Sequence, residues 1–134
     1  LSGESLFGNS AAGLGDLDGD GVPDALVGAP RINRVFVLFL NTDGTVKSEA
    51  VHYHLDIDTS ASLQADNFGY GMCSLGDLDR DGVVDVLVGA IRDDDGGWDR
   101  GAAYVLFLET DGSVKGHQKI SATAGGGVPE LDAD

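Results

Sequence analysis

The chain has 134 residues, a length that suits one ordinary domain. Its formal net charge of −15 and its pI near 4.1 argue against nucleic acid and anionic membrane surfaces as partners, because both need a basic face. The 21 glycines favour short strands and many turns, and the single cysteine excludes an internal disulfide. Since no apolar run approaches the roughly 20 residues of a membrane span, we expect no membrane insertion.

The first expected strand runs from about Gly8 to Leu14 and leads into an acidic loop, residues 16–24. This loop has aspartates at its positions 1, 3, 5 and 9 and glycine at position 6. Hard cations such as Ca²⁺ take six to eight oxygen ligands, which alternating aspartates in a tight loop provide, and the position 7 carbonyl adds another. The glycine permits the positive φ that such a loop needs. The predicted ligands are Asp16, Asp18, Asp20, Asp24 and the carbonyl of Val22.

An EF-hand is the obvious alternative, because its loop begins in the same way. That loop ends in a bidentate glutamate at position 12 and continues into a helix. Here position 12 is Val27, inside the short apolar run 25–28, and the same position of a second copy is Val88. Short β-branched runs bounded by turn residues are typical of strands, so the acidic loop is expected to join two strands.

The next two strands are predicted at Val35–Leu40 and at about Glu49–Leu55, joined by a Thr-Asp-Gly turn. The first of them is almost wholly apolar, as expected for a strand that is covered on both faces. In the other, alternation places His52 and His54 on one face. These histidines could bind a transition metal, but a solvated strand face is favoured.

The chain then repeats itself. Residues 7–31 and 68–92, offset by 61, are identical at 16 of 25 positions, and residues 37–47 recur at 105–115 with 9 of 11 identical. The residues that change the offset lie in a loop at 92–101 of the second copy. Self-similarity of this kind indicates a repeat architecture whose insertions fall in loops.

In the second copy we predict strands near Gly69–Leu75, Val84–Gly89, Ala102–Leu108 and Gln118–Ser121. The second set of cation ligands is Asp77, Asp79, Asp81, Asp85 and the carbonyl of Val83. Cys73 takes the place of Ala12, so a small buried side chain is its expected role.

The loop at 92–101 allows two interpretations. Its tryptophan, Trp98, could stack on a sugar or anchor a protein, although a side chain tucked against its own repeat is favoured. Its aspartates, Asp93, Asp94 and Asp95, could add an ion site, although a solvated loop is favoured.

The combined motif resembles the FG-GAP repeat family, as found in the propeller blades of integrin α-chains and in bacterial surface proteins. Phe7-Gly8 and Phe68-Gly69 match the FG element, Gly28-Ala29-Pro30 matches GAP, and Gly89-Ala90-Ile91 lacks the proline. The family carries its calcium motif between these two elements, as this sequence does. Arg80 replaces the usual glycine at position 4, which is not a ligand position.

The resemblance implies an all-β fold of two four-stranded antiparallel propeller-type blades, each with one Ca²⁺ loop. We expect repeat units at residues 1–66 and 67–134, the second ending where a third Phe-Gly element would begin. Since two blades leave apolar faces and strand edges uncovered, their partners are expected to be neighbouring blades or copies of the chain. The expected function is extracellular or cell-surface binding or adhesion toward a protein or glycan, within a larger array. The alternative is a structural protein that assembles into a filament or ring, and no catalytic motif is found.

Overall fold

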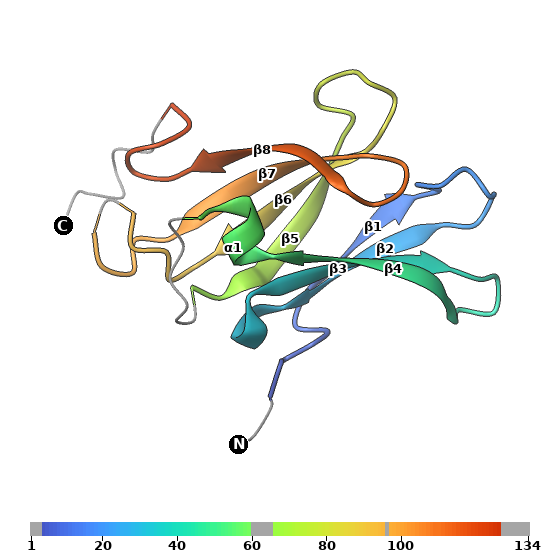
Figure 1. The fold of residues 1–134 in the computed structure, drawn as a ribbon, viewed down its shortest axis with the longest axis horizontal. Helices are drawn as coiled ribbons and strands as arrows, with labels where there is room; N and C mark the ends of the chain where they lie inside the picture. The colour runs from blue at the N-terminus through green and yellow to red at the C-terminus, as the bar shows by residue number, and fades with distance from the viewer. Residues whose placement is uncertain (1–3, 60–65, 96, 127–134) are drawn as a thin grey trace.

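The computed structural model describes residues 4–59, 66–95 and 97–126, and these form two four-stranded antiparallel sheets (Figure 1). The fold is therefore all-β, as predicted, with each sheet a meander in which strands follow one another in chain order. The first sheet contains β1 (Ala11–Gly15), β2 (Asp24–Ala29), β3 (Arg34–Leu40) and β4 (Val46–Tyr53). The second contains β5 (Phe68–Gly76), β6 (Asp85–Ala90), β7 (Ala102–Leu108) and β8 (Val114–Ile120).

Two short helical turns accompany the first sheet, and one of them corrects the predicted end of its last strand. The turn η1 (Pro30–Ile32) follows β2, and α1 (His54–Ile57) follows β4 directly. Asp58 N–H donates to the His54 carbonyl, which closes one helical turn where the sequence predicted further strand. Because the strand ends at Tyr53, the alternation expected for His54 does not apply.

The first strand also begins later than predicted. Residues 7–10 form a turn, in which Asn9 N–H donates to the Leu6 carbonyl and Gly8 has a φ of 90°. The last strand, β8, begins at Val114, earlier than the predicted Gln118, so the strand starts directly after the turn that follows β7. The predicted third repeat boundary falls in residues 127–134 and lies outside the described residues.

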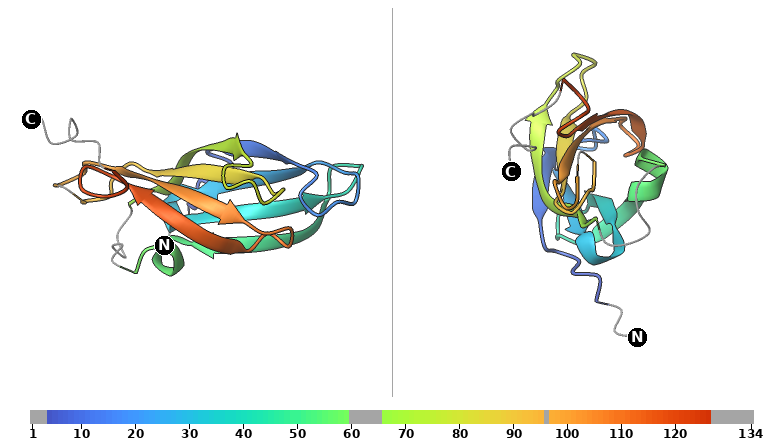
Figure 2. Two further views of the ribbon diagram at one scale, coloured as in Figure 1. Left: turned by 90° about the horizontal axis from the view of Figure 1, so that it is seen from above. Right: turned by 90° about the vertical axis from the view of Figure 1, so that its left-hand side faces the viewer.

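The two sheets pack face to face around one apolar core, with β5 lying against β1 and β2 (Figures 1 and 2). The first sheet contributes alternate residues of its strands, because alternate side chains point to the same face. In the second sheet the buried side chains are those on the other face of the equivalent strands: Val35 and Val37 are buried in β3, whereas Tyr104 and Leu106 are buried in β7. The largest core side chains are Leu26, Val35, Val37 and Phe39 from the first sheet and Phe68, Val86, Val88, Tyr104, Leu106 and Leu108 from the second.

The two motif glycines meet at the junction of the sheets. A Cβ added at Gly28 would lie 2.1 Å from the carbonyl oxygen of Gly69, and Gly69 itself has a φ of 91°. Ser10 Oγ donates to this carbonyl at 2.7 Å, and Asn33 Oδ1 accepts from Phe68 N–H at 3.0 Å. The FG element of one repeat thus packs on the GAP element of the preceding one, which explains why both need glycine.

Candidate metal centres

The first acidic loop is anchored by Asp24, the first residue of β2, whose side chain is buried. Its Oδ2 accepts the N–H of Leu17 at 2.9 Å, and its Oδ1 accepts the N–H of Leu40 at 3.1 Å. The carboxylate therefore joins the start of the loop to the end of β3. Two charge-assisted hydrogen bonds from backbone donors satisfy this buried charge and fix its direction.

The rest of the loop folds through hydrogen bonds from its own backbone to its aspartates. Asp16 Oδ2 accepts Gly21 N–H at 2.8 Å, and Asp20 Oδ1 accepts Val22 N–H at 2.8 Å. Gly21, at position 6, has a φ of 87°, which confirms the predicted need for glycine there.

The second loop repeats this arrangement. Asp85 is buried and accepts Leu78 N–H at 2.8 Å and Leu108 N–H at 3.3 Å. Asp77 Oδ2 accepts Gly82 N–H at 2.8 Å. The two loops differ at position 4, where Arg80 has a φ of 64° in place of glycine at 78° in the first loop. A residue with a Cβ is strained in this left-handed region, so the second loop carries a local cost of about 1 kcal/mol that the first does not.

The structure brings three of the predicted carboxylates of each loop together. Ligand oxygens within 4.8 Å of one another come from Asp16, Asp18 and Asp24 in one loop and from Asp77, Asp79 and Asp85 in the other. An all-oxygen donor set on a tight loop fits a hard divalent cation such as Ca²⁺. The position 5 aspartates and the position 7 carbonyls of Val22 and Val83 stay predictions as ligands.

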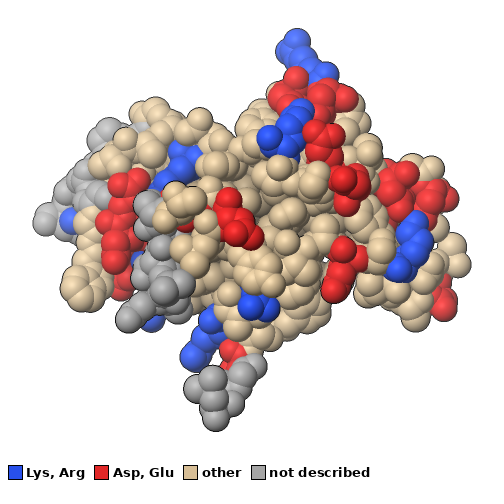
Figure 3. Space-filling view, viewed as in Figure 1, with Lys and Arg blue, Asp and Glu red and all other residues tan. Residues whose placement is uncertain are grey.

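A lysine at equivalent places in the two repeats faces the aspartates at positions 3 and 5. Lys47 Nζ, from β4, lies 2.6 Å from Asp18 Oδ2 and also contacts Asp20, and Lys115 Nζ, from β8, contacts Asp79 and Asp81. Hydrogen bonds to the two aspartates raise the pKa of each lysine. In the same view as Figure 1, the surface shows acidic patches with basic atoms among them at the top and at the right, where these two loops lie (Figure 3).

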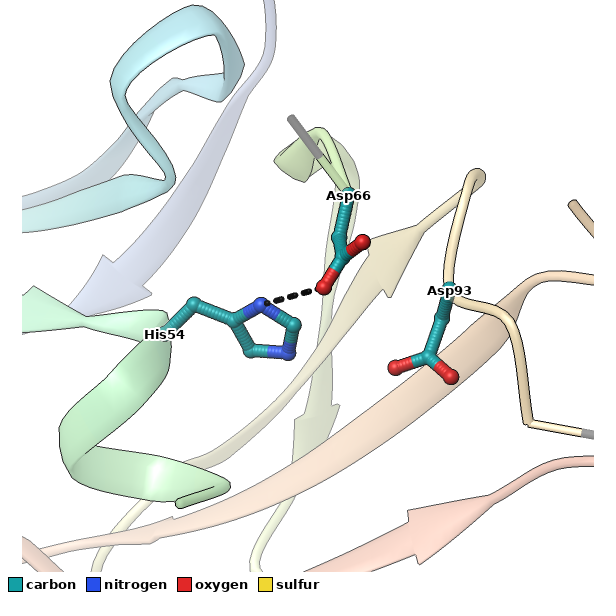
Figure 4. A group of neighbouring side chains, drawn as sticks. All are labelled: His54, Asp66 and Asp93. Atoms are coloured by element: carbon teal, nitrogen blue, oxygen red, sulfur yellow. Dashed lines mark ion pairs between the residues drawn. The ribbon is translucent and has the colours of Figure 1, made fainter. Parts of the chain in front are cut away.

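A second cluster of ionisable groups lies at the other end of the sheets, where sequence reasoning expected solvent. His54 at the start of α1 is only 1% exposed, and its Nδ1 lies 3.5 Å from Asp66 Oδ2 (Figure 4). Asp93, in the loop after β6, is 3% exposed and lies beside them. The preference for solvated side chains at His54 and Asp93 was therefore wrong. Burial lowers the pKa of His54, which favours the neutral imidazole.

Two further residues of the second sheet hold Asp93 in place. The Tyr104 hydroxyl oxygen lies 2.9 Å from Asp93 Oδ2 and 2.7 Å from Asp58 Oδ2, so its single proton is shared between these two carboxylates. Lys119 Nζ lies 3.0 Å from both Asp58 Oδ2 and Asp93 Oδ1 and 3.7 Å from Asp95 Oδ2. Burial alone would lower the pKa of Lys119, but hydrogen bonds to Asp58 and Asp93 outweigh it and raise that pKa. No sequence signal joined these residues, because their partners lie 11 to 61 positions away.

Two further candidate residues, Trp98 and Cys73, are exposed, whereas His52 is half-buried. Trp98 is 87% exposed, so the expectation that it packs against its own repeat was wrong. Cys73 is exposed as well, contrary to prediction, because it lies on the face of the second sheet that no other described sheet covers. His52 stands between the two sheets, with its Nε2 2.7 Å from the Gly112 carbonyl oxygen.

Among the described residues, helices are too short to cross a membrane.

Comparison with known proteins agrees with these features. The chain is 38% identical to integrin alpha-4 of Xenopus laevis over 107 residues, which is 75% of this chain and 10% of that protein. It is 34% identical to human integrin alpha-7 over 92 residues, 67% of this chain and 7% of the relative. It is 31% identical to integrin alpha pat-2 of Caenorhabditis briggsae over 82% of this chain and 9% of the relative. The chain thus spans about a tenth of the length of these relatives.

The profile of FG-GAP-like repeats matches residues 16–88, a segment that runs from the first acidic loop through the second and includes the junction of the two sheets. This match covers more than half of the chain. The chain therefore belongs to the FG-GAP-like repeat family.

Proposed function

We propose that this chain is a calcium-stabilised, extracellular pair of propeller blades that serves binding or adhesion within a larger array. The observation that carries the proposal is the pair of acidic loops in which the aspartates at positions 1, 5 and 9 accept equivalent backbone N–H groups. In each, a buried position 9 aspartate joins the loop to the third strand of its sheet. A cation held by such a loop would fix the turn between the first two strands.

The proposed ligands are the predicted ones, with one Ca²⁺ for each loop. Asp16, Asp18, Asp20, Asp24 and the Val22 carbonyl would hold the first ion, and Asp77, Asp79, Asp81, Asp85 and the Val83 carbonyl would hold the second. When bound, the ion neutralises carboxylates that otherwise repel one another. Since it binds the folded loop and not the unfolded chain, it stabilises the fold by mass action. Extracellular calcium modules have dissociation constants of about 10⁻⁴–10⁻³ M, which suits the proposed location.

The proposed units, residues 1–66 and 67–134, leave one face of each sheet for neighbouring blades. On these faces Phe7 is 54% exposed and Leu78 is 54% exposed. Their equivalents, Phe68 and Leu17, are buried at the junction. A free face that matches a buried one suits packing of further blades in the same manner. The relatives, of which the matched segments are only 10% and 7%, support a larger parent array.

The surface offers features that suit recognition of a protein or glycan. A hollow of about 330 Å³ at the junction is lined by side chains of both repeats, including Arg31 and Arg92, which occupy equivalent positions. Trp98 presents an exposed indole in the loop that begins at Arg92. Arginine and tryptophan are the residues that most often anchor protein interfaces. No catalytic role is proposed for this chain.

A second candidate function is self-assembly. The junction joins two different faces, so copies of the chain could continue it head to tail and produce a ring or a filament. Size-exclusion chromatography and electron microscopy of the 134 residues in calcium separate the two functions. A monodisperse monomer contradicts self-assembly, whereas regular polymers contradict a passive segment of a larger propeller.

Calcium removal tests the main proposal. We expect EDTA to lower the melting temperature of the protein and added Ca²⁺ to restore it. The double variant Asp20→Ala, Asp81→Ala should respond less, because each loop loses a ligand. Glu49→Gln, which removes one negative charge from exposed β4, should respond as the natural chain does. An unchanged melting temperature in EDTA would refute a structural ion.

A further inference from the structure

We propose that His54, Asp66 and Asp93 form a binding site for a divalent transition metal, with zinc as the expected ion, at the junction of the two sheets. The site lies apart from the two acidic loops. The inference does not rest on the calcium proposal, because its ligands and its location are different.

The three side chains come from three separate segments and converge in the interior (Figure 4). His54 begins α1, Asp66 precedes β5, and Asp93 follows β6. Their exposed fractions are 1%, 5% and 3%, and one ligand atom from each lies within 4.8 Å of the other two. Ligands about 2.0 Å from a tetrahedral zinc ion are about 3.3 Å apart, close to the 3.5 Å between His54 Nδ1 and Asp66 Oδ2. Zinc binding would therefore need only a small movement of Asp93 toward the other two ligands.

The histidine supplies an observation that a merely acidic cluster would lack. Both ring nitrogens of His54 are buried and have no hydrogen-bond partner. A buried polar group without a partner costs about 1–3 kcal/mol, and imidazole is a preferred ligand of zinc. The ring stacks on Phe68 at 4.7 Å between centroids and meets Tyr104 edge-on at 5.0 Å, so its orientation is fixed by packing. A metal ion between the ring and the carboxylates would satisfy the ring without moving it.

Asp93 is already oriented as metal-binding carboxylates usually are. Its carboxylate accepts hydrogen bonds from Asp95 N–H and from the Tyr104 hydroxyl that it shares with Asp58. It also forms an ion pair with Lys119. An ionised carboxylate has about four acceptor positions, and the contacts named above use three of them. Such outer contacts hold metal ligands in place and raise their affinity. Lys119 carries one positive charge among three carboxylates, those of Asp58, Asp93 and Asp95. The net charge of this group is therefore negative, which favours binding of a further cation.

The donor set selects the kind of metal. Calcium takes six to eight oxygens, whereas this cluster offers one nitrogen and carboxylates from only two ligating residues. Zinc accepts three protein ligands of this type with solvent in the fourth place. Because His54 follows the last strand of the first sheet and Asp66 and Asp93 flank strands of the second, a bound ion would link the two sheets at their junction.

The test is zinc titration by calorimetry in millimolar calcium, which keeps the acidic loops occupied by calcium, followed by native mass spectrometry. We expect one zinc ion for each chain. His54→Phe keeps the stacked ring and removes both nitrogens, and Asp93→Asn keeps the shape and removes the charge. Each should weaken zinc binding by more than about tenfold. His117→Gln, which changes an exposed histidine on β8, should bind zinc as the natural chain does.

The exposed thiol of Cys73 is a competing zinc ligand, so the site needs a second readout. X-ray absorption at the zinc edge should show nitrogen and oxygen neighbours without sulfur, and Cys73→Ser should leave affinity unchanged. Circular dichroism checks that each variant is folded. Full zinc affinity in folded His54→Phe, a sulfur neighbour, or no zinc binding to the natural chain would each overturn the proposal.

Discussion

The two sheets share most of their sequence, yet they bury opposite faces. Leu17 is 6% exposed in the first repeat, whereas its equivalent Leu78 is 54% exposed in the second. Phe7 is 54% exposed, whereas Phe68 is fully buried. Cys73 is exposed where Ala12 packs against the core. Identical or similar side chains thus differ in burial because each repeat meets the other through a different face.

This difference shows that the unit of stability is the junction between repeats. Each sheet has two apolar faces, and the face that one sheet buries is the face that the other leaves open. Such an interface is heterologous and extends in one direction, as in repeat proteins whose stability is a sum of neighbour contacts. Equivalent substitutions in the two repeats should therefore have unequal effects, and these effects can test the comparison.

The largest difference is expected at the glycines of the GAP elements. Gly28→Ala would drive a methyl group to 2.1 Å from the Gly69 carbonyl oxygen, whereas the same atom at Gly89 would lie 3.5 Å from its nearest neighbour. Overpacking of backbone against backbone should lower the free energy of unfolding by about 3 kcal/mol or more. Gly89→Ala should be neutral or slightly stabilising, because alanine loses less entropy in a strand. Chemical denaturation measures both, and equal effects would contradict the comparison.

The next largest difference is expected at the FG phenylalanines. Phe68→Ala removes a fully buried ring that stacks on His54, and it should cost about 3–5 kcal/mol of stability. Phe7→Ala should cost much less, because more than half of that ring is already exposed. The melting temperatures of the two variants measure which substitution costs more stability. A larger loss at Phe7 would mean that a further copy covers that face in solution.

The smallest difference is expected at position 4 of the acidic loops. Arg80→Gly removes a residue with a Cβ from a φ of 64°, so it should raise the free energy of unfolding by about 1 kcal/mol. Gly19→Arg should lower it by a similar amount, because the backbone there has a φ of 78°. Urea denaturation at fixed calcium measures both changes. If neither substitution changes stability, the two loops are equivalent despite their different residues.

The sequence was most informative where function depends on local chemistry. Aspartate spacing and the position 6 glycine predicted loops whose backbone folds around the carboxylates, because all the participants lie within nine residues. Apolar runs predicted the central strands β2, β3, β6 and β7 to within about a residue. Prediction failed at the strand ends near Gly8 and Leu55, where hydrogen bonds close a turn and a helical turn.

The sequence by itself determined the repeat, the strand pattern, the two acidic loops and the family, since each is written in neighbouring residues. Only the tertiary structure decided which face of each sheet is buried, and it alone joined His54 to Asp66 and Asp93. The reason is physical: identical repeats carry identical local preferences, and burial depends on what packs against them. The order of the two sheets, not their composition, made Phe68 a core residue and left Phe7 at the surface.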